Sequence, residues 1–344
     1  MNIPLSGDLS EADLLAGRLA GTLDWVNDIQ IRQGLLAREM AALCGENLSG
    51  FLSACTESPM LGSAIPPAIR TLYKIAIEID DYPASAQQIA NVHAWLHGDT
   101  SSDRRAVHLF SAVADLLQEE NPFLIRAGLM LFRMTLLEAE LPGARRTGQM
   151  LVCAFSVSGG IVPWPGLGLS AFLNATSADH LKLCKAAEKT GNPEKWLVYF
   201  LNGVARQCED LISRITRLEE LLRKWKQTAE GRSNKMAAKL ISRLAGNPFL
   251  TAKGAAADLH SAFTTAQRAV DKLLEAGIVQ ETTHQQRDRI YCAGEILAIL
   301  EEPPRVMGVS PWREEEILPE PLIQEEPEVA HSRHDPAAKL PDIY

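Results

Sequence analysis

Apolar residues recur at spacings of three and four along most of the 344-residue chain, which is the period of a helix with one buried face. Upstream of Pro193, this pattern predicts helices at about 10–44, 68–79, 85–97 (with Ser85 as its N-cap), 104–119, 122–139, 147–157 and 178–190. A longer helix is expected from Pro193 to Gln227, with an apolar face formed by Trp196, Phe200, Leu201, Val204, Leu211, Ile215 and Leu218. The glycine- and proline-rich stretch at 158–168 is expected to be irregular. The fold class is therefore expected to be mainly α.

The segment 235–300 follows a different pattern, in which helices are short and β-prone stretches appear. KMAAKLISRLAG (235–246) predicts a helix that ends at a glycine, and NPFLT after it predicts a short extended piece. Thr251 is suited to cap the next helix, which is expected to run through Leu259. This segment is therefore predicted to start with two helices joined by extended chain.

A further helix and a hairpin complete the segment. Thr264 or Thr265 is expected to open the helix, which ends at Gly277. Two β-prone stretches, 278–280 and 289–293, then flank a polar connection. Helix, turn, helix and hairpin follow in this order in a winged helix-turn-helix domain, a common DNA-binding module.

One face of the second of these helices is polar and basic, as a DNA-contacting helix requires. Threonine, glutamine and arginine near a helix N-terminus suit base edges and phosphates in a major groove. The residues expected to contact DNA are Thr264, Thr265, Gln267, Arg268 and Lys272 of the helix, and Arg287 and Arg289 of the hairpin. Winged helices also bind proteins, and Asp271 on the same face leaves that alternative open.

The composition points to a cytoplasmic protein. Apolar residues make up 46% of the chain, and no run of about 18 of them occurs, so no membrane span is expected. The N-terminus lacks the basic and apolar segments of a secretion signal. The six cysteines are scattered without metal-ligand spacing, as reduced thiols usually are.

The net charge of −9 is concentrated at the C-terminus. Residues 301–344 hold 11 acidic residues and 4 Lys/Arg, so they account for −7 of the total. This Pro-rich acidic tail is expected to be disordered. The remainder of the chain is close to neutral, so the acidic pI does not exclude a locally basic surface that faces DNA.

A loop that reads ELPGARRTGQM (140–150) has the composition of a phosphate cradle. Glycines, arginines and a threonine at the start of a helix can hold an anion on free backbone N–H groups. The candidate anion- or nucleotide-binding residues are Gly143, Arg145, Arg146, Thr147 and Gly148. In the alternative interpretation, the two arginines form surface ion pairs with Glu138 or Glu140. The loop itself contains no histidine or aspartate to act as an acid, base or metal ligand.

Two histidines, His93 and His97, are spaced as i and i+4 on a predicted helix. This spacing can bind a metal ion, but no third ligand lies nearby in sequence. We therefore predict no metal site, and nothing in the sequence points to a cofactor.

Parts of the chain resemble the Fic (filamentation induced by cAMP) family. TTAQRAVDKLLEAGIV (264–279) and RDRIY (287–291) are similar to the winged helix at the C-terminus of many Fic proteins. The stretch 185–222 is similar to the helical end of a Fic domain, with matching elements at Gly191, Trp196 and Phe200–Val204. The resemblance covers about 85–300 and implies a helical bundle. The layout is also similar to a helix-turn-helix family of unknown function from plant-associated bacteria.

The resemblance also aligns the loop at 140–150 with the catalytic motif of the Fic family. The Fic motif reads H-P-F-x-x-G-N-G-R-x-G-R, and Gly143, Arg146 and Gly148 match it. Four functional positions differ, since Glu138 replaces the catalytic histidine, Pro142 takes the acidic metal-binding position, Arg145 replaces a glycine, and Gln149 replaces the second arginine.

These substitutions are expected to abolish adenylyl transfer. A carboxylate at 138 repels a polyphosphate, whereas the family's histidine takes a proton from the target hydroxyl. Proline cannot hold Mg²⁺, and glutamine cannot form the bidentate phosphate contact of arginine. The loop is therefore interpreted as the remnant of an active site, in a protein that is not expected to be an enzyme.

The expected architecture has four parts: an N-terminal helical region (1–84), a Fic-like helical bundle (85–230), a small winged helix-turn-helix (231–300) and the tail (301–344). The favoured function is a transcriptional regulator that binds double-stranded DNA, with the Fic-like body used for dimerisation or sensing. The first alternative is an atypical nucleotidyl (AMP) transferase that uses Glu138 and Arg146. The second is a protein-interaction scaffold. A homodimer and a nucleotide or other anionic ligand remain open as partners, whereas membrane association is not expected.

Overall fold

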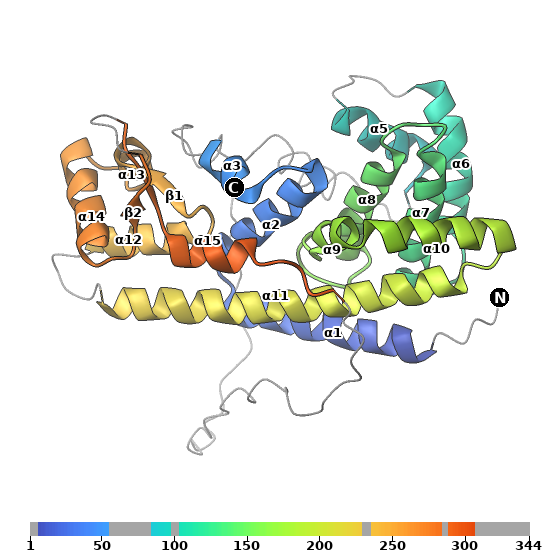
Figure 1. Cartoon of the computed structure of the whole chain (residues 1–344), viewed down its shortest axis with the longest axis horizontal. Coiled ribbons are helices and arrows are strands. Elements are labelled where there is room, and N and C mark those ends of the chain that lie inside the picture. The colour runs from blue at the N-terminus through green and yellow to red at the C-terminus, as the bar shows by residue number, and fades with distance from the viewer. Residues whose placement is uncertain (1–5, 55–83, 98–102, 229–234, 284–287, 307–344) are drawn as a thin grey trace, which may run out of the picture. The chain divides into compact units, whose positions relative to one another are not determined.

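Figure 1 shows the computed structural model, which describes residues 6–54, 84–97, 103–228, 235–283 and 288–306. The chain is mainly α, as predicted, and a small three-stranded sheet lies within 249–292. The predicted helix at 68–79, Arg287, and the tail from residue 307 lie outside the described residues.

The N-terminal stretch at about 10–44, which was predicted to be helical, forms two separate helices. Helix α1 (Ser6–Val26) and helix α2 (Ile29–Cys44) are separated at Asn27, which has a φ of 41°. Asp28 then caps α2, because its carboxylate accepts a hydrogen bond from the backbone N–H of Gln30 at 2.8 Å. Gly45, in the left-handed conformation, ends α2, and α3 (Leu48–Ala54) follows.

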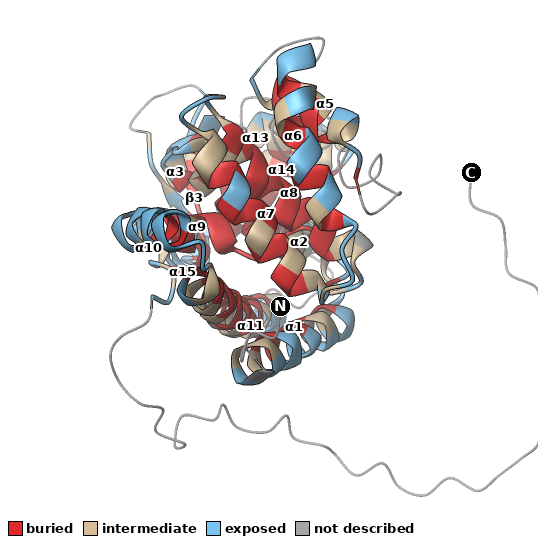
Figure 2. Ribbon diagram, turned by 90° about the vertical axis from the view of Figure 1, so that its right-hand side faces the viewer, coloured by how far each residue is buried: buried red, intermediate tan, exposed pale blue. Residues whose placement is uncertain are grey.

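Six helices build the central body: α5 (Ala86–Leu96), α6 (Arg104–Leu117), α7 (Phe123–Leu137), α8 (Ala144–Ser158), α9 (Leu169–Ala175) and α10 (Ser177–Thr190). Ser85 caps α5 through a complete capping box with Gln88, as predicted. The short helix α9 was not predicted. In Figure 2, buried residues concentrate along α7, α8 and α11, whereas α10 turns an exposed face outward.

The long helix α11 (Glu194–Thr228) organises the body, and α1 packs along it (Figure 1). Trp196 is fully buried, and its indole N–H donates to the carbonyl oxygen of Gly128 at 3.1 Å. A Cβ on Gly128 would lie 2.8 Å from a ring carbon of Phe200, so glycine allows α7 to approach α11 closely. The apolar face predicted from the sequence is therefore the face that packs against the body.

The C-terminal segment follows the predicted order. Its elements are α12 (Lys235–Leu244), β1 (Phe249–Thr251), α13 (Ala252–Asp258), α14 (Phe263–Glu275), β2 (Gln280–Glu281), β3 (Ile290–Cys292) and α15 (Gly294–Glu301). The strands are antiparallel in the order β1-β3-β2, and Cys292 pairs with both Phe249 and Gln280. The hydroxyl of Thr251 accepts from the N–H of Gly254 at 3.0 Å, which confirms the predicted cap of α13.

Two details of this segment differ from the prediction. Helix α14 begins at Phe263 after Ala262, and no side chain caps it, so Thr264 and Thr265 lie within its first turn. Helix α15 was not predicted, and it extends across the expected boundary at residue 300. The local sequence favours a threonine cap, but the turn at His260–Ala262 positions the helix start before either threonine is reached.

The C-terminal segment packs on the body through α12 and α15. Helix α12 contacts α2 and α11, and α15 contacts α2, α3 and α11. At Gly34 of α2, an added Cβ would clash with the carbonyl oxygen of Ala245, directly after α12. Residues up to Met307 group into one unit by their contacts. The predicted boundary near 230 lies outside the described residues.

Candidate functional site: the loop before α8 and the outer face of α14

The loop between α7 and α8 is shorter than the sequence indicated. Glu138 follows α7 directly, and Gly143 precedes α8 in the left-handed conformation, with a φ of 88°. Helix α8 begins at Ala144 and not at about 147. The arginines and Thr147 therefore belong to the first turn of the helix, whereas they were expected in the loop before it.

The carboxylate of Glu138 closes the N-terminus of α8. Its Oε1 accepts from the backbone N–H of Gly143 at 3.0 Å, and its Oε2 accepts from the backbone N–H of Arg145 at 2.8 Å. Free N–H groups and the helix dipole make such a terminus a site for anions. Here the chain's own carboxylate occupies the position that two oxygens of a phosphate would take.

The two arginine side chains do not form the expected surface pairs. In the part of the chain that the structure describes, neither guanidinium forms an ion pair with Glu138 or Glu140. Arg145 instead lies near His180 of α10, where its charge contributes to lowering the pKa of that imidazole. The Nε of Arg146 is buried without a hydrogen-bond partner among the described residues.

The remaining motif residues mostly face the core. The Thr147 hydroxyl donates to the carbonyl oxygen of Gly143 at 3.0 Å and is fully buried. A Cβ on Gly148 would lie 2.8 Å from the Cβ of Met134, so this glycine lets α8 pack on α7. Gln149 is buried and Pro142 is exposed. Thr147 and Gly148 thus pack against the core from the first turns of α8, and their binding of an anion stays a prediction.

A histidine from the end of another helix lies against the loop, which the loop sequence alone did not predict. His97 ends α5, and its ring lies so close to Gly143 that an added Cβ would clash with it. His93, one turn earlier, places Nδ1 2.9 Å from the Thr147 hydroxyl. The two rings lie 4.6 Å apart between centroids. Among the described residues, no group of three or more His, Cys, Asp or Glu is arranged to hold a metal ion.

A second buried histidine lies behind the loop. His180 places Nε2 3.2 Å from the hydroxyl of Thr135, which itself donates to the carbonyl oxygen of Leu131 at 2.8 Å. The imidazole is therefore the donor, and its Nδ1 lies buried without a hydrogen bond in the described chain. Burial, and then the charge of Arg145, lower the pKa of His180 from 6.5 to about 4. The ring is neutral at pH 7.

The polar residues predicted to contact DNA lie on the outer face of α14, which we define as Thr264, Thr265, Gln267, Arg268 and Lys272. The two threonines and the arginine are exposed, and the other two residues are half-buried. Helix α14 packs on α12 and α13 through a buried apolar side. Figure 1 shows it at the end of the structure remote from α5–α10.

Two acidic residues restrain the polar groups near this face. The amide nitrogen of Gln267 donates to Asp271 at 2.8 Å. Arg289 of the hairpin lies 3.5 Å from a carboxylate oxygen of Glu281 on the neighbouring strand. Of the two basic side chains expected from the hairpin, one is therefore partly neutralised and Arg287 lies outside the described residues. Phe263, which was not among the predicted DNA-contacting residues, is 55% exposed at the start of the same helix.

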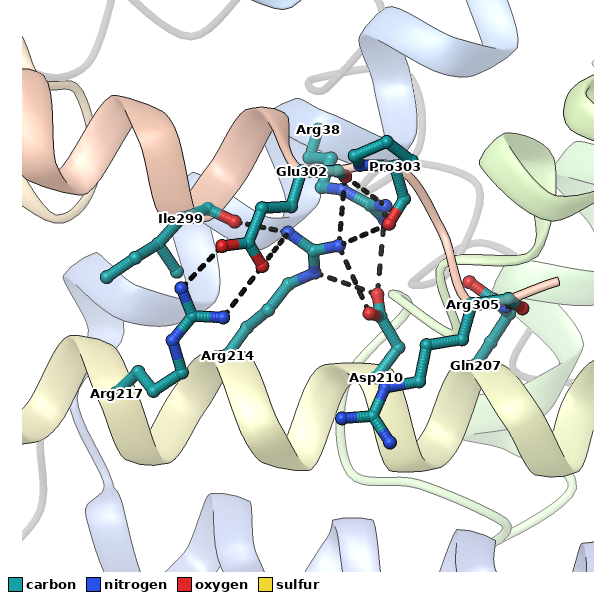
Figure 3. Close-up of polar contacts among 9 residues, drawn as sticks. All are labelled: Arg38, Gln207, Asp210, Arg214, Arg217, Ile299, Glu302, Pro303 and Arg305. Atoms are coloured by element: carbon teal, nitrogen blue, oxygen red, sulfur yellow. Dashed lines mark hydrogen bonds and ion pairs between the residues drawn. The ribbon is translucent and has the colours of Figure 1, made fainter.

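Arg214 of α11 fixes the end of α15 (Figure 3). Its guanidinium donates to both carboxylate oxygens of Asp210, at 2.7 and 3.1 Å, and to the carbonyl oxygens of Ile299, Glu302 and Pro303. The last carbonyl groups of a helix lack partners within the helix. The buried guanidinium therefore caps α15 and ties it to α11.

Two more arginines extend this contact, which we call the arginine clamp and define as Arg38, Asp210, Arg214, Arg217 and Glu302. Arg38 of α2 lies 3.7 Å from Asp210. Burial, and then neighbouring Arg214, lower the pKa of Arg38. Arg217 forms a bidentate pair with Glu302, at 2.5 and 2.7 Å. The clamp therefore joins α2, α11 and the end of α15 (Figure 3).

The fold is similar to that of a Fic family protein from Desulfovibrio desulfuricans G20, with a TM-score of 0.51. The alignment covers 85% of this chain and 96% of that chain at 12% sequence identity. At that identity the similarity shows the fold alone, and it confirms the Fic-like helical fold expected from the sequence. No family model and no curated protein matches the sequence. None of the described helices has the combination of length and apolar composition that a membrane span requires.

Proposed function

We propose that this protein is a DNA-binding transcriptional regulator, in which a non-catalytic Fic-like body carries a winged helix-turn-helix. The observation that carries the proposal is the outer face of α14. Thr264, Thr265 and Arg268 are exposed in the first turns of a helix whose opposite side is buried. Residues of these types at the N-terminal end of such a helix read base edges and bind phosphates.

The surrounding elements support this assignment. Helix α12, the pair α13 and α14, and the hairpin of β2 and β3 follow the order of a winged helix, and β1 completes its three-stranded sheet. The hairpin is the wing, beside which Arg289 supplies a basic side chain. Lys272 extends the basic surface by one turn beyond Arg268.

The loop before α8 supports the absence of catalysis. A general base must present a free carboxylate or imidazole to the proton that it takes. The Glu138 carboxylate bonds two backbone N–H groups of its own chain, so it is neither oriented toward a substrate nor compatible with a phosphate in the same place. Transfer of a nucleotide by Glu138 and Arg146 therefore gains no support from this geometry.

Binding to sheared genomic DNA, followed by fluorescence anisotropy at 50 and 200 mM salt, tests the proposal. We expect binding that weakens steeply with salt, because phosphate neutralisation releases counterions. Arg268→Ala should make the negative slope of log K against log salt less steep by about 0.9, the value for one phosphate contact. The matched control is Lys185→Ala, which removes an exposed cation from α10. Absence of binding at low salt, or equal losses in both variants, would overturn the proposal.

A further inference from the structure

We infer that Phe263 is a specificity-determining residue that contacts the C5-methyl group of a thymine in the major groove. This inference rests on the proposed function, because it assigns a base to the same face of α14. Phe263 is the first residue of α14, directly before the exposed pair Thr264 and Thr265. The N-terminal residues of a recognition helix are the ones that reach base edges.

Phe263 is a large apolar residue that remains mostly exposed in the folded chain. Phe263 is 55% exposed, and it is not one of the buried residues that form the hydrophobic core. The buried side of α14 begins one turn later, at Ala266. An exposed aromatic ring keeps its apolar surface in water, and a partner that covers the ring recovers the free energy of burial.

The surroundings of Phe263 favour a base edge over a protein surface. Protein-docking surfaces are usually contiguous apolar patches. Within the described residues, the other large exposed apolar side chain on α14 is Leu274, at the opposite end of the helix. Two exposed threonines follow Phe263 directly, and the exposed Arg268 lies five residues after it on the same helix. A single aromatic ring among hydroxyl groups and a cation matches a thymine, which offers a methyl group beside an acceptor oxygen.

The experiment replaces thymine by deoxyuridine, which differs only in lacking the methyl group. Duplexes are first selected from a random pool with the full-length wild-type protein, and each thymine of the selected sequence is then replaced in turn. At one position the replacement should weaken wild-type binding about fourfold, the equivalent of one buried methyl group. Phe263→Ala should bind the two duplexes equally, with the salt slope of the wild type.

Two further variants make the result specific. Leu274→Ala removes an exposed apolar side chain from the same helix and should keep the fourfold preference. Phe263→Leu should retain part of it, because an apolar contact remains. If no thymine replacement affects the wild type, or if Phe263→Ala keeps the fourfold preference for thymine over deoxyuridine, the inference is wrong while salt-dependent DNA binding still stands. If the pool yields no enriched sequence and the protein does not bind DNA, the proposed function fails together with it.

Discussion

The carboxylate of Glu138 accepts a hydrogen bond from the backbone N–H of Gly143 at 3.0 Å, five residues further along the chain. In an anion-binding loop, that N–H faces a ligand. In this chain the Glu138 carboxylate takes the place of such a ligand. Because it belongs to the same chain, its effective concentration at the N–H group is high. The Glu138 carboxylate therefore satisfies the N–H groups of Gly143 and Arg145 from within the chain.

Removing this carboxylate should destabilise the protein and expose an anion site. We expect Glu138→Ala to lower the free energy of unfolding by about 1–2 kcal/mol, because the first N–H groups of α8 lose a charged acceptor. Inorganic phosphate should restore part of this loss in the variant and have little effect on the wild type. Urea unfolding with and without phosphate measures both effects.

Glu140→Ala is the control, since its side chain is exposed beside the same loop. The variant should unfold like the wild type under both conditions. A stable Glu138→Ala protein, indifferent to phosphate, would show that the hydrogen bonds to Gly143 and Arg145 contribute little to the loop.

The buried imidazole of His180 predicts a loss of stability in mild acid. Its pKa is about 4 in the folded protein and 6.5 for an ordinary histidine. Above pH 6.5 both states are neutral, whereas between pH 6.5 and 4 only the unfolded chain takes up the proton. The free energy of unfolding should therefore fall by up to about 3 kcal/mol as the pH is lowered through this window.

Urea unfolding of His180→Gln at several pH values from 7.5 to 4.5 isolates this contribution from that of the carboxylates. The variant should lose less stability than the wild type between pH 6.5 and 4. His108→Gln, which replaces an exposed histidine of α6, should keep the wild-type pH dependence. Parallel curves for all three proteins would contradict the role assigned to His180.

Within the arginine clamp, the buried and the exposed arginines should differ in their contributions. Arg214→Ala removes the donor to the last carbonyl groups of α15 and leaves the buried Asp210 with Arg38, at 3.7 Å, as its remaining cation, which should cost about 3–5 kcal/mol. Arg217→Ala removes a pair with Glu302 whose side chains are 42% and 43% exposed, and should cost about 1 kcal/mol or less. Chemical denaturation measures both values, and similar costs would show that burial does not decide the strength of the clamp.

The close approach at Gly34 gives a test of the contact between the body and the C-terminal segment. Gly34→Ala places a methyl group against the carbonyl oxygen of Ala245 and should cost about 1–3 kcal/mol. Gly17→Ala, in α1, meets open space and should stabilise the protein by about 1 kcal/mol or less. Thermal unfolding distinguishes the two, and a neutral Gly34→Ala would mean that α2 and α12 separate at little cost.

The features that the sequence predicted well depend on neighbouring residues. The caps at Ser85 and Thr251 each use an interaction over three residues, which a local pattern contains. The break at Asn27–Asp28 was missed because apolar residues keep a helical spacing on both sides of it, and a single left-handed residue redirects the chain.

The features that the sequence did not predict depend on residues that are far apart in the chain. The contact of His97 with Gly143 joins two helices, so a reading of the loop alone found no histidine there. Arg214 reaches the carbonyl of Ile299, which lies 85 positions later. Glu138 was interpreted as the replacement of a catalytic base. Comparison with a motif gives the position of a residue, but it does not show that the Glu138 carboxylate accepts two backbone hydrogen bonds.

The arginine clamp has a consequence for how the molecule opens. Arg214 of α11 donates hydrogen bonds to the carbonyl oxygens at the end of α15, so the last turn of α15 can fray only when these hydrogen bonds break. Its amide protons should therefore exchange with solvent as slowly as those at the centre of α11, and the two segments should open as a single cooperative unit. A chain shortened at residue 230 would leave the guanidinium of Arg214 without its carbonyl acceptors, so the segment proposed to bind DNA also contributes to the stability of the body that carries it.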